Sequence, residues 1–325
     1  MPNRGATGSA LDNWTVVDAH CDTLTVILDK GRPFCLETEE GHLDLPRLKR
    51  GGVKVQFFAA FVHPRYRGGY LRRTLALIDA FHREVVSTPE VLVVLGDNDL
   101  ERVADGGSDR VAAVLAVEGG EALESSTAVL RMLYHLGLRC LGLTWNGRNE
   151  LADGVGETGS RGGLTAFGRA VVSEMNRLGM VVDLAHLGER GFLDVLEVSE
   201  KPVIVSHANA RALCDHPRNL TDVQIRALSE RGGVVGVTFV PDFVDSAEPS
   251  RDKLLDHIEH VVQTGGPDCV GLGSDFDGFG GRLRGLEHAG LVGELGPALL
   301  DRGYSADDVA KIMGGNLLRV LKQVL

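Results

Sequence analysis

The sequence predicts a (β/α)8 barrel from three observations. Short apolar segments rich in Val alternate with helical patterns along the whole chain of 325 residues, which is typical of a parallel sheet. Roughly eight such units follow one another without a break in composition, and this favours a closed barrel over an open doubly wound sheet. Several segments end on His, Asp or Glu, as expected where the C-terminal rim of a barrel carries an active site. No GxGxxG or Walker-type loop follows the first segment, which weakens the nucleotide-binding alternative.

The strands are expected where apolar runs are short and rich in β-branched residues. In chain order they are residues 15–22, 53–61, either 91–96 or 111–118, then 140–146, 180–186, 202–207, 233–239 and 269–276.

The helices are expected between these strands, where apolar residues recur every three or four positions. In residues 70–86 this spacing puts Leu71, Leu75, Ile78 and Phe81 on one face. A further helix should begin after Ser305, in a start that resembles a capping box. The other predicted helices are residues 164–179, 191–200, 221–232, 251–265 and the amphipathic C-terminal stretch 317–325.

No composition shift marks a domain boundary. Residues 1–13 are polar and are expected to form a loose tail, and residues 14–325 a single catalytic barrel domain. The Gly-rich stretch 146–163 reads as a long loop, and long loops after barrel strands often build the site.

The overall charge narrows the range of partners. A formal net charge of -11 disfavours nucleic acid and anionic membrane surfaces, because both favour a basic face.

The N-terminus lacks the apolar core of a signal peptide, and no apolar run approaches the length of a membrane span. The five cysteines are scattered without a CxxC pair. We therefore expect a reduced cytoplasmic protein without a membrane partner.

The first predicted strand ends in a pair of metal-type ligands. His20 and Asp22 are two positions apart, so on a strand their side chains point to the same side and can bind one metal ion. Asp18 shares that side, either as a partner of the ligands or as a buried structural carboxylate.

Three later strands also end in residues suited to metal binding. Glu118 ends the run at 111–118, and a carboxylate there either closes a turn or bridges two metal ions with its two oxygens. His186 and His207 end consecutive strands at equivalent positions, and neutral imidazole suits zinc. Together these residues suggest bound metal and hydrolysis.

Two further residues are candidates for handling the substrate. Asp275 ends the last strand, where a carboxylate beside two metals would hold the attacking water and pass its proton to the leaving amine. The following Asp277–Gly278 pair is typical of a turn. Arg218 lies in the loop after the sixth strand, where a guanidinium would grip a substrate carboxylate.

These motifs together resemble the renal (membrane) dipeptidase family, a branch of the metal-dependent amidohydrolase barrels. The resemblance covers most of the chain, with separated motifs in the family's order. They include DAHCDTL, AVEGG, LTWNGRNELADG, DLAH, SHANARALCDHPRNLTD and GLGSDFDG.

The resemblance implies a distorted (β/α)8 barrel with two zinc ions and hydrolysis of dipeptides, including those with a C-terminal D-residue. Carried over, His20 and Asp22 bind one zinc, His186 and His207 bind the other, and Glu118 bridges them. In the same way Asp275 matches the family's acid/base aspartate, and Arg218 matches the arginine that binds the dipeptide carboxylate. Dimers are common in the family, so a homodimer is a further expectation.

Two departures from the family pattern bear on substrate identity and rate. The LTH motif of mammalian members, whose His contacts the substrate, reads LTWN here, with Trp145. Trp offers one N–H donor and no charge, and Asn146 or the loop would have to compensate. Phe243 stands where a substrate-contacting Tyr aligns, so one hydroxyl contact is missing.

Two alternatives stay open from the sequence. One is another amidohydrolase reaction on the same metals, on a small amide, lactone or ester. Relatives of that kind often bridge their metals with a carbamylated lysine, whereas Glu118 occupies the strand tip here. The other alternative is a catalytically silent metal-binding barrel. The native metal is also open, because sites of His and carboxylate accept several divalent ions.

Overall fold

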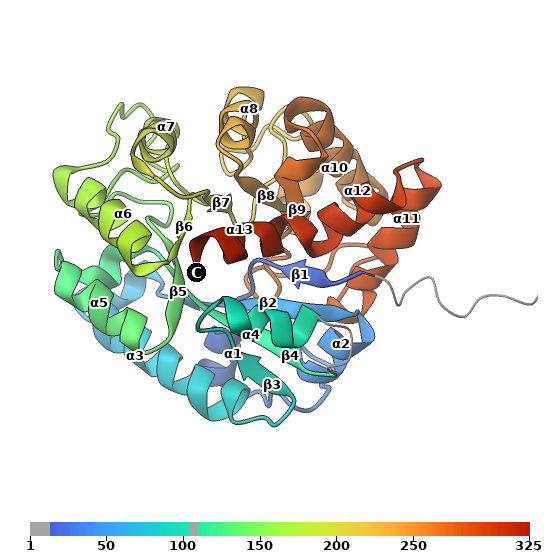
Figure 1. Ribbon diagram of the computed structural model, residues 1–325, viewed down its shortest axis with the longest axis horizontal. Helices are drawn as coiled ribbons and strands as arrows, with labels where there is room; N and C mark the ends of the chain where they lie inside the picture. The colour runs from blue at the N-terminus through green and yellow to red at the C-terminus, as the bar shows by residue number, and fades with distance from the viewer. Residues whose placement is uncertain (1–13, 105–108) are drawn as a thin grey trace, which may run out of the picture.

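The computed structural model describes residues 14–104 and 109–325. Its nine strands are all parallel (Figure 1). They are β1 (Val16–Asp18), β2 (Val53–Phe61), β3 (Val91–Val93), β4 (Val111–Glu118), β5 (Leu138–Gly142), β6 (Val181–Asp183), β7 (Ile204–Val205), β8 (Val234–Val237) and β9 (Val270–Leu272).

Eight of these strands close into a barrel. Hydrogen-bonded neighbours run in the order β2-β1-β9-β8-β7-β6-β5-β4, and pairing of β2 with β4 joins the two ends. This confirms the predicted (β/α)8 class. The predicted tail over residues 1–13 lies outside the described residues, and a single domain over 14–325 stays a prediction.

The ninth strand explains an ambiguity in the sequence, which offered 91–96 or 111–118 as the third strand. Both segments form strands, but β4 is the barrel member. One edge of β4 pairs with β2 along Ala112–Glu118. The other edge is shared, because β3 pairs with the first residues of β4 and β5 with the last. β4 is long enough, at eight residues, to carry both neighbours.

The helices that were expected from periodicity are present. They are α3 (Tyr70–Ala80), which continues as a π-helical turn (Phe81–Val86), then α6 (Ala166–Leu178), α7 (Glu189–Val198), α8 (Asp222–Glu230), α10 (Arg251–Gly265), α12 (Ala306–Ala310) and α13 (Asn316–Val324).

Six further helices were not anticipated from the sequence. Each has nine residues or fewer, so it spans too few turns for an apolar repeat to stand out in the sequence. They are α1 (Thr23–Lys30), α2 (Leu45–Arg50), α4 (Asp97–Ala104), α5 (Thr127–His135), α9 (Pro241–Val244) and α11 (Leu295–Asp301). Short 3₁₀ segments lie at Pro64–Tyr66, Gly120–Leu123, Pro267–Cys269 and Ala289–Glu294, and a second π-helical turn at Lys311–Gly315.

Side-chain caps begin α12, as was predicted, and α8, where no cap was predicted. The Ser305 hydroxyl accepts the backbone N–H of Asp308 at the start of α12. At α8 the capping box is complete, because Thr221 and Gln224 each accept the other's backbone N–H. Such caps satisfy N–H groups that the first turn leaves without partners.

Helix α13 closes the end of the barrel at which the strands begin. Its apolar residues Leu317, Val320 and Leu321 join one buried cluster with Val17 and Val55 of the barrel interior. Figure 1 views the molecule from this side, with α13 crossing in front of the strands. The C-terminal ends of the strands are therefore the open end of the barrel.

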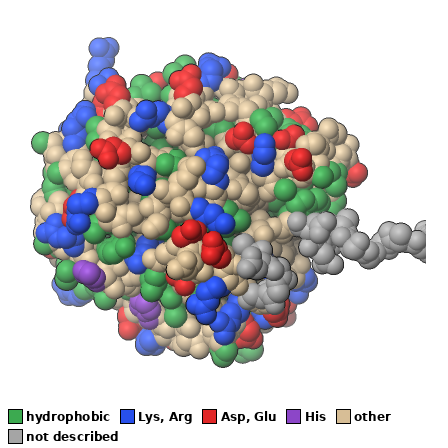
Figure 2. Space-filling view, viewed as in Figure 1, with side chains coloured by type: hydrophobic (Ala, Val, Ile, Leu, Met, Phe, Trp, Pro, Cys, Tyr) green, Lys and Arg blue, Asp and Glu red, His purple; other side chains and the backbone are tan. Residues whose placement is uncertain are grey.

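The surface on the α13 side carries mixed charge. Figure 2 shows acidic and basic side chains interspersed over this face, so the net charge of -11 is not gathered there into one acidic patch. Among the helices of residues 14–104 and 109–325, none combines the length and apolarity needed to cross a membrane.

The carboxylate of Asp277 ties the turn after β9 to segments early in the chain. It forms an ion pair with Arg32, with Nη1 3.0 Å from Oδ1, and accepts hydrogen bonds from the Thr23 hydroxyl and the His42 backbone N–H. The two charged side chains are only 2 and 8% exposed. Burial by itself raises the pKa of Asp277, but the Arg32 hydrogen bonds and charge hold it below its usual value.

We expect the Asp277→Asn variant to be less stable by about 3–5 kcal/mol, because it leaves the buried Arg32 charge unpaired. Since the folded-state pKa is depressed, the wild-type advantage is present at neutral pH and is lost as the pH falls below about 4. Thermal unfolding of the wild type and the variant, at neutral pH and below about pH 4, checks this. The control Asp79→Asn removes an exposed partner of Arg83 and should cost about 0.5 kcal/mol or less. Equal shifts in the two variants would contradict the prediction.

Candidate metal centre

The predicted metal ligands all lie at the C-terminal ends of barrel strands. Glu118 is the last residue of β4, and His20, His186 and His207 each follow a strand end by two or three residues. Because parallel strands end at the same rim, these side chains meet in space. The five predicted ligands are buried, and the Asp275 side chain is 13% exposed.

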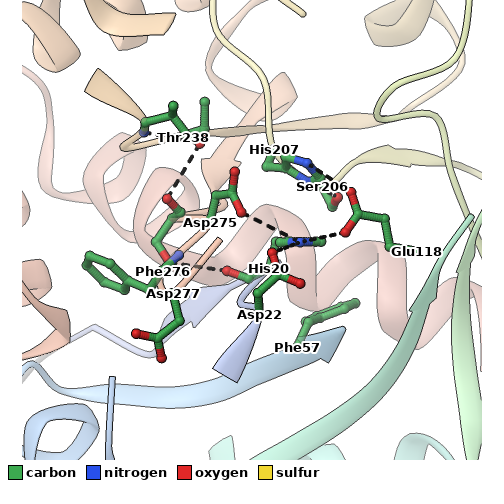
Figure 3. A network of polar contacts seen from close by, with 12 residues as sticks. His20, Asp22, Phe57, Glu118, Ser206, His207, Thr238, Asp275, Phe276 and Asp277 are labelled. Atoms are coloured by element: carbon green, nitrogen blue, oxygen red, sulfur yellow. Dashed lines mark hydrogen bonds and ion pairs between the residues drawn. The ribbon is translucent and has the colours of Figure 1, made fainter. Parts of the chain in front are cut away.

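Glu118 lies between two groups of histidines. Its Oε1 is 2.7 Å from His186 Nε2 and 3.8 Å from His207 Nε2. Its Oε2 is 3.5 Å from His20 Nε2. The two oxygens of one carboxylate therefore face different imidazoles, as Figure 3 shows for His20 and His207.

The remaining ligands complete overlapping groups around Glu118. His20 Nε2 is 3.8 Å from both Asp22 Oδ2 and Asp275 Oδ1. His186 Nε2 and His207 Nε2 are 3.0 Å apart. Three sets have ligand atoms within 4.8 Å of one another: His20, Asp22 and Glu118; Glu118, His186 and His207; and His20, His207 and Asp275.

The unpaired polar atoms of this cluster fit a cation. His20 Nε2 and Asp22 Oδ1 are buried without a hydrogen-bond partner. A buried polar atom without a partner is costly, and a bound divalent ion would satisfy both. Imidazole nitrogens and carboxylate oxygens are donors that zinc accepts, and several other divalent metals accept them too.

The electrostatics keep two of the imidazoles neutral. Burial and the nearby Arg218 charge lower the pKa of His186 to about 4. Burial, His20 and Arg218 likewise hold the pKa of His207 well below its ordinary value. A neutral imidazole has a free lone pair, which is the form that binds metal.

The carboxylates divide into two kinds. Burial tends to raise the pKa of Glu118, but His20 and His186 hold it well below its usual range. Burial raises the pKa of Asp275 well above its ordinary value, and Asp22 and Glu118 raise it further against the lowering effect of His20. Glu118 is thus suited to stay charged, whereas Asp275 is suited to carry a proton.

Two side chains orient the imidazoles of His186 and His207 through contacts with their Nδ1 atoms. The Nδ1 of His186 lies 2.7 Å from Oδ1 of Asn146. The Nδ1 of His207 lies 2.8 Å from the Ser206 hydroxyl, which donates to Asp183 at 2.6 Å. These contacts leave both Nε2 atoms facing Glu118, an arrangement common around metal-bound histidine. The contact of Asn146 with substrate stays a prediction, and its carbonyl oxygen Oδ1 is the atom that meets His186.

Asp183 and Ser206 were missed by the sequence reasoning, although a signal exists. The segment VVD recurs at 16–18 and 181–183, each time shortly before a predicted ligand. Asp18 plays a matching part, since its two oxygens accept the backbone N–H and hydroxyl of Ser274 at 2.7 and 2.6 Å. Asp18 therefore braces the residue before Asp275.

Two of the predicted site residues have unusual backbones. His186 and Asp275 have φ values of 64° and 63°, in the left-handed region that non-glycine residues rarely adopt. Such conformations cost about 1–3 kcal/mol each and are found where surrounding contacts hold a functional side chain in place. The chain after β9 also passes close to the chain after β7. A Cβ on Gly273 would overlap the carbonyl oxygen of Ser206, so glycine is needed at this position, two residues before Asp275.

Arg218 is a buried cation directed at the centre. Its Nη2 donates to the His207 carbonyl oxygen at 3.0 Å, while its Nε has no partner. The guanidinium carbon lies 5.7 Å from the centre of the Phe243 ring, and that ring stacks on His216 at 4.3 Å. Phe243, predicted to contact substrate, thus packs against Arg218.

Trp145 lies at the edge of the cluster. Its ring centre is 6.0 Å from that of His186 and 5.4 Å from that of Phe61, and the side chain is half-buried. It is close enough to the predicted ligands to reach a molecule bound over them.

Comparison with known proteins identifies the family. Residues 8–325 match the model of the membrane dipeptidases, peptidase family M19. The chain belongs to the membrane dipeptidase family. Among relatives, it is 37% identical to Dipeptidase aclJ of Aspergillus oryzae, over 87% of this chain and 70% of that protein. It is 33% identical to human Dipeptidase 3, over 99% of this chain and 67% of that protein.

The fold agrees with solved members of the family. A metallo peptidase from Rhodobacter sphaeroides, liganded with a phosphinate mimic of the dipeptide L-Ala-D-Ala, superposes with a TM-score of 0.87 at 30% identity, over 97% of this chain and 100% of that one. The prediction of a metal-dependent dipeptidase of the membrane dipeptidase family is thereby confirmed. Membership implies a bound metal; its identity and number are separate questions.

Proposed function

We propose that this protein hydrolyses dipeptides with two zinc ions. The proposed ligands are His20, Asp22, Glu118, His186 and His207. The observation that carries the proposal is the position of Glu118, whose two oxygens face His20 on one side and His186 on the other. A carboxylate placed in this way is suited to bridge two cations.

The chain's own residues would divide the remaining work. Two bound cations would polarise the scissile carbonyl and lower the pKa of a bound water toward about 7. Asp275, whose Oδ1 lies 3.8 Å from His20 Nε2, would take the proton of the attacking water in its carboxylate form and deliver it to the departing amine nitrogen.

Arg218 would select substrates that end in a free carboxylate close to the scissile bond. A buried guanidinium with an unpaired Nε favours an anionic ligand over a neutral lactone or ester. In a dipeptide the terminal carboxylate lies one residue beyond the cleaved bond, which explains a limit to short peptides. The relative with an L-Ala-D-Ala mimic supports tolerance of a C-terminal D-residue here as well.

The test is a dipeptide panel on metal-free and zinc-loaded protein. We expect about two zinc ions per chain at full activity, loss of hydrolysis after chelation, and recovery on adding zinc. L-Ala-L-Ala and L-Ala-D-Ala should be cleaved, and L-Ala-L-Ala amide should be a poor substrate. Efficient cleavage of the amide, or full activity with one ion per chain, would overturn the corresponding part of the proposal.

Arg218→Met should raise KM and lower kcat/KM for dipeptides by about 10- to 100-fold, the value of a hydrogen bond to a charged group. The matched control is Arg211→Met, because Arg211 lies on the same loop, pairs with Asp215 and is 44% exposed. That control should keep its kinetics. Similar kinetics for the two variants would remove Arg218 from its role.

The compartment and the oligomeric state are two further parts of the proposal. All five cysteines are free in the structure, and four of them are buried, which supports a reducing compartment such as the cytoplasm. A homodimer stays a prediction, which light scattering of the purified protein would check.

A further inference from the structure

Three aromatic side chains, Phe61, His63 and Trp145, form a surface beside the metal centre, which we call the aromatic wall. The ring centres of Phe61 and Trp145 are 5.4 Å apart, and His63 lies 6.3 Å from Phe61 and 6.0 Å from Trp145. Each ring therefore contacts the other two.

The aromatic wall is accessible rather than part of the core. Phe61 and Trp145 are half-buried, and neither belongs to the apolar clusters of the described residues; His63 is exposed. Ligand sites are typically lined by aromatic side chains that pack on the ligand while a few polar groups orient it.

The wall adjoins the proposed catalytic residues on one side of the barrel. Phe61 is the last residue of β2 and is paired in register with Glu118 of β4. Trp145 follows β5, and its ring centre is 6.0 Å from that of His186. A molecule bound over Glu118 and His186 thus has the wall next to it.

The wall and Arg218 follow different strands of the barrel. In the closed order β1-β2-β4-β5-β6-β7-β8-β9, the wall follows β2 and β5, whereas Arg218 follows β7 and its ring partner Phe243 follows β8. The two sets of strands do not overlap, and in this order His186, which follows β6, lies between Trp145 and Arg218.

A dipeptide bound between Arg218 and the wall has only one orientation, on the function proposed above. Its carboxylate belongs to the C-terminal residue and lies at Arg218. Its scissile carbonyl belongs to the N-terminal residue and lies over the proposed metal ligands. The Cα of the N-terminal residue, which carries both its side chain and its amino group, then lies beyond this carbonyl, on the side of the wall.

We infer that the aromatic wall binds the side chain of the substrate's N-terminal residue and selects large apolar or aromatic side chains there. This inference rests on the proposed dipeptidase function. It assigns Trp145 a part in choosing the substrate.

The experiment compares L-Phe-L-Ala, L-Ala-L-Phe and L-Ala-L-Ala on zinc-loaded protein. We expect kcat/KM for L-Phe-L-Ala to exceed that for L-Ala-L-Ala by about tenfold or more, the scale of discrimination that an apolar pocket gives. Trp145→Ala and Phe61→Leu should each lower this ratio severalfold. Neither variant should change the ratio of L-Ala-L-Phe to L-Ala-L-Ala, because that side chain lies on the Arg218 side.

Controls separate the wall from general damage and from the proposed function. Met132→Ala, at a side chain 57% exposed on α5, should keep both ratios and the activity. Zinc content and thermal unfolding check that each variant is folded. Because there are two wall variants, Trp145→Ala and Phe61→Leu, the test remains if one of them does not fold. A wild-type ratio near one, or a ratio unchanged in both wall variants, overturns the inference while dipeptide hydrolysis stands. No hydrolysis of any dipeptide overturns the proposed function as well.

Discussion

The Asp275→Asn variant is expected to keep its zinc and lose about 10²- to 10⁴-fold in kcat, the contribution typical of a general acid–base group. The amide of Asn has nearly the shape of the carboxyl group of Asp, but it neither takes nor releases a proton near neutral pH. KM should change little, because Arg218 and the metal ligands are untouched. Steady-state kinetics and metal analysis of the same preparation check the loss of kcat and the retention of zinc.

Asp275 has a second possible role that this variant distinguishes. Its Oδ1 lies 3.8 Å from His20 Nε2, and with His20 and His207 it forms one of the sets that could hold an ion. Loss of zinc together with activity would make Asp275 a ligand and contradict the acid–base assignment. The control Asp79→Asn, on the exposed face of α3, should match the wild type in both measurements.

The Glu118→Gln variant is expected to bind no more than one zinc ion per chain and to lose on the order of 10³-fold or more in activity. Gln keeps the length of Glu but replaces one acceptor oxygen with an NH₂ donor, so it cannot serve two cations. Loss of one Lewis acid removes several kcal/mol of transition-state stabilisation.

A matched control for this variant lies three residues along the chain. Glu121→Gln makes the same chemical change at a half-buried carboxylate outside the metal-binding sets found among the described residues. It should keep two zinc ions. If Glu118→Gln also keeps two, Glu118 is not the bridge and the binuclear proposal loses its main support.

The Glu118 and Asp275 variants also show how much of the site is readable in the sequence. An apolar run that stops on His or a carboxylate predicts a buried strand that ends in a polar side chain. Both the strand and its polar end are visible in a short stretch of sequence. Parallel strands then bring those tips to one rim. His20, Glu118 and Asp275 could be proposed in this way, before any contact between them was known.

Other parts of the site depend on contacts that no local pattern reveals. Asn146 carries no sign that its carbonyl oxygen meets His186, 40 residues away. Asp277 looks like a turn residue, and it does adopt a turn backbone with φ 68°, yet its carboxylate pairs with Arg32 across 245 residues. In Figure 3 Asp277 points away from the cluster that holds Asp275, two positions earlier.

The sequence by itself determined the barrel class, the strand-end candidates and the family, because periodicity, burial and motif order are properties of the linear chain. Only the tertiary structure decided which of two segments closes the barrel, which side chains orient the imidazoles, and that the aromatic wall lies beside the metal centre. The physical reason is barrel closure. Pairing of β2 with β4 brings together residues far apart in the chain, and such contacts follow from the whole ring of strands rather than from any segment alone.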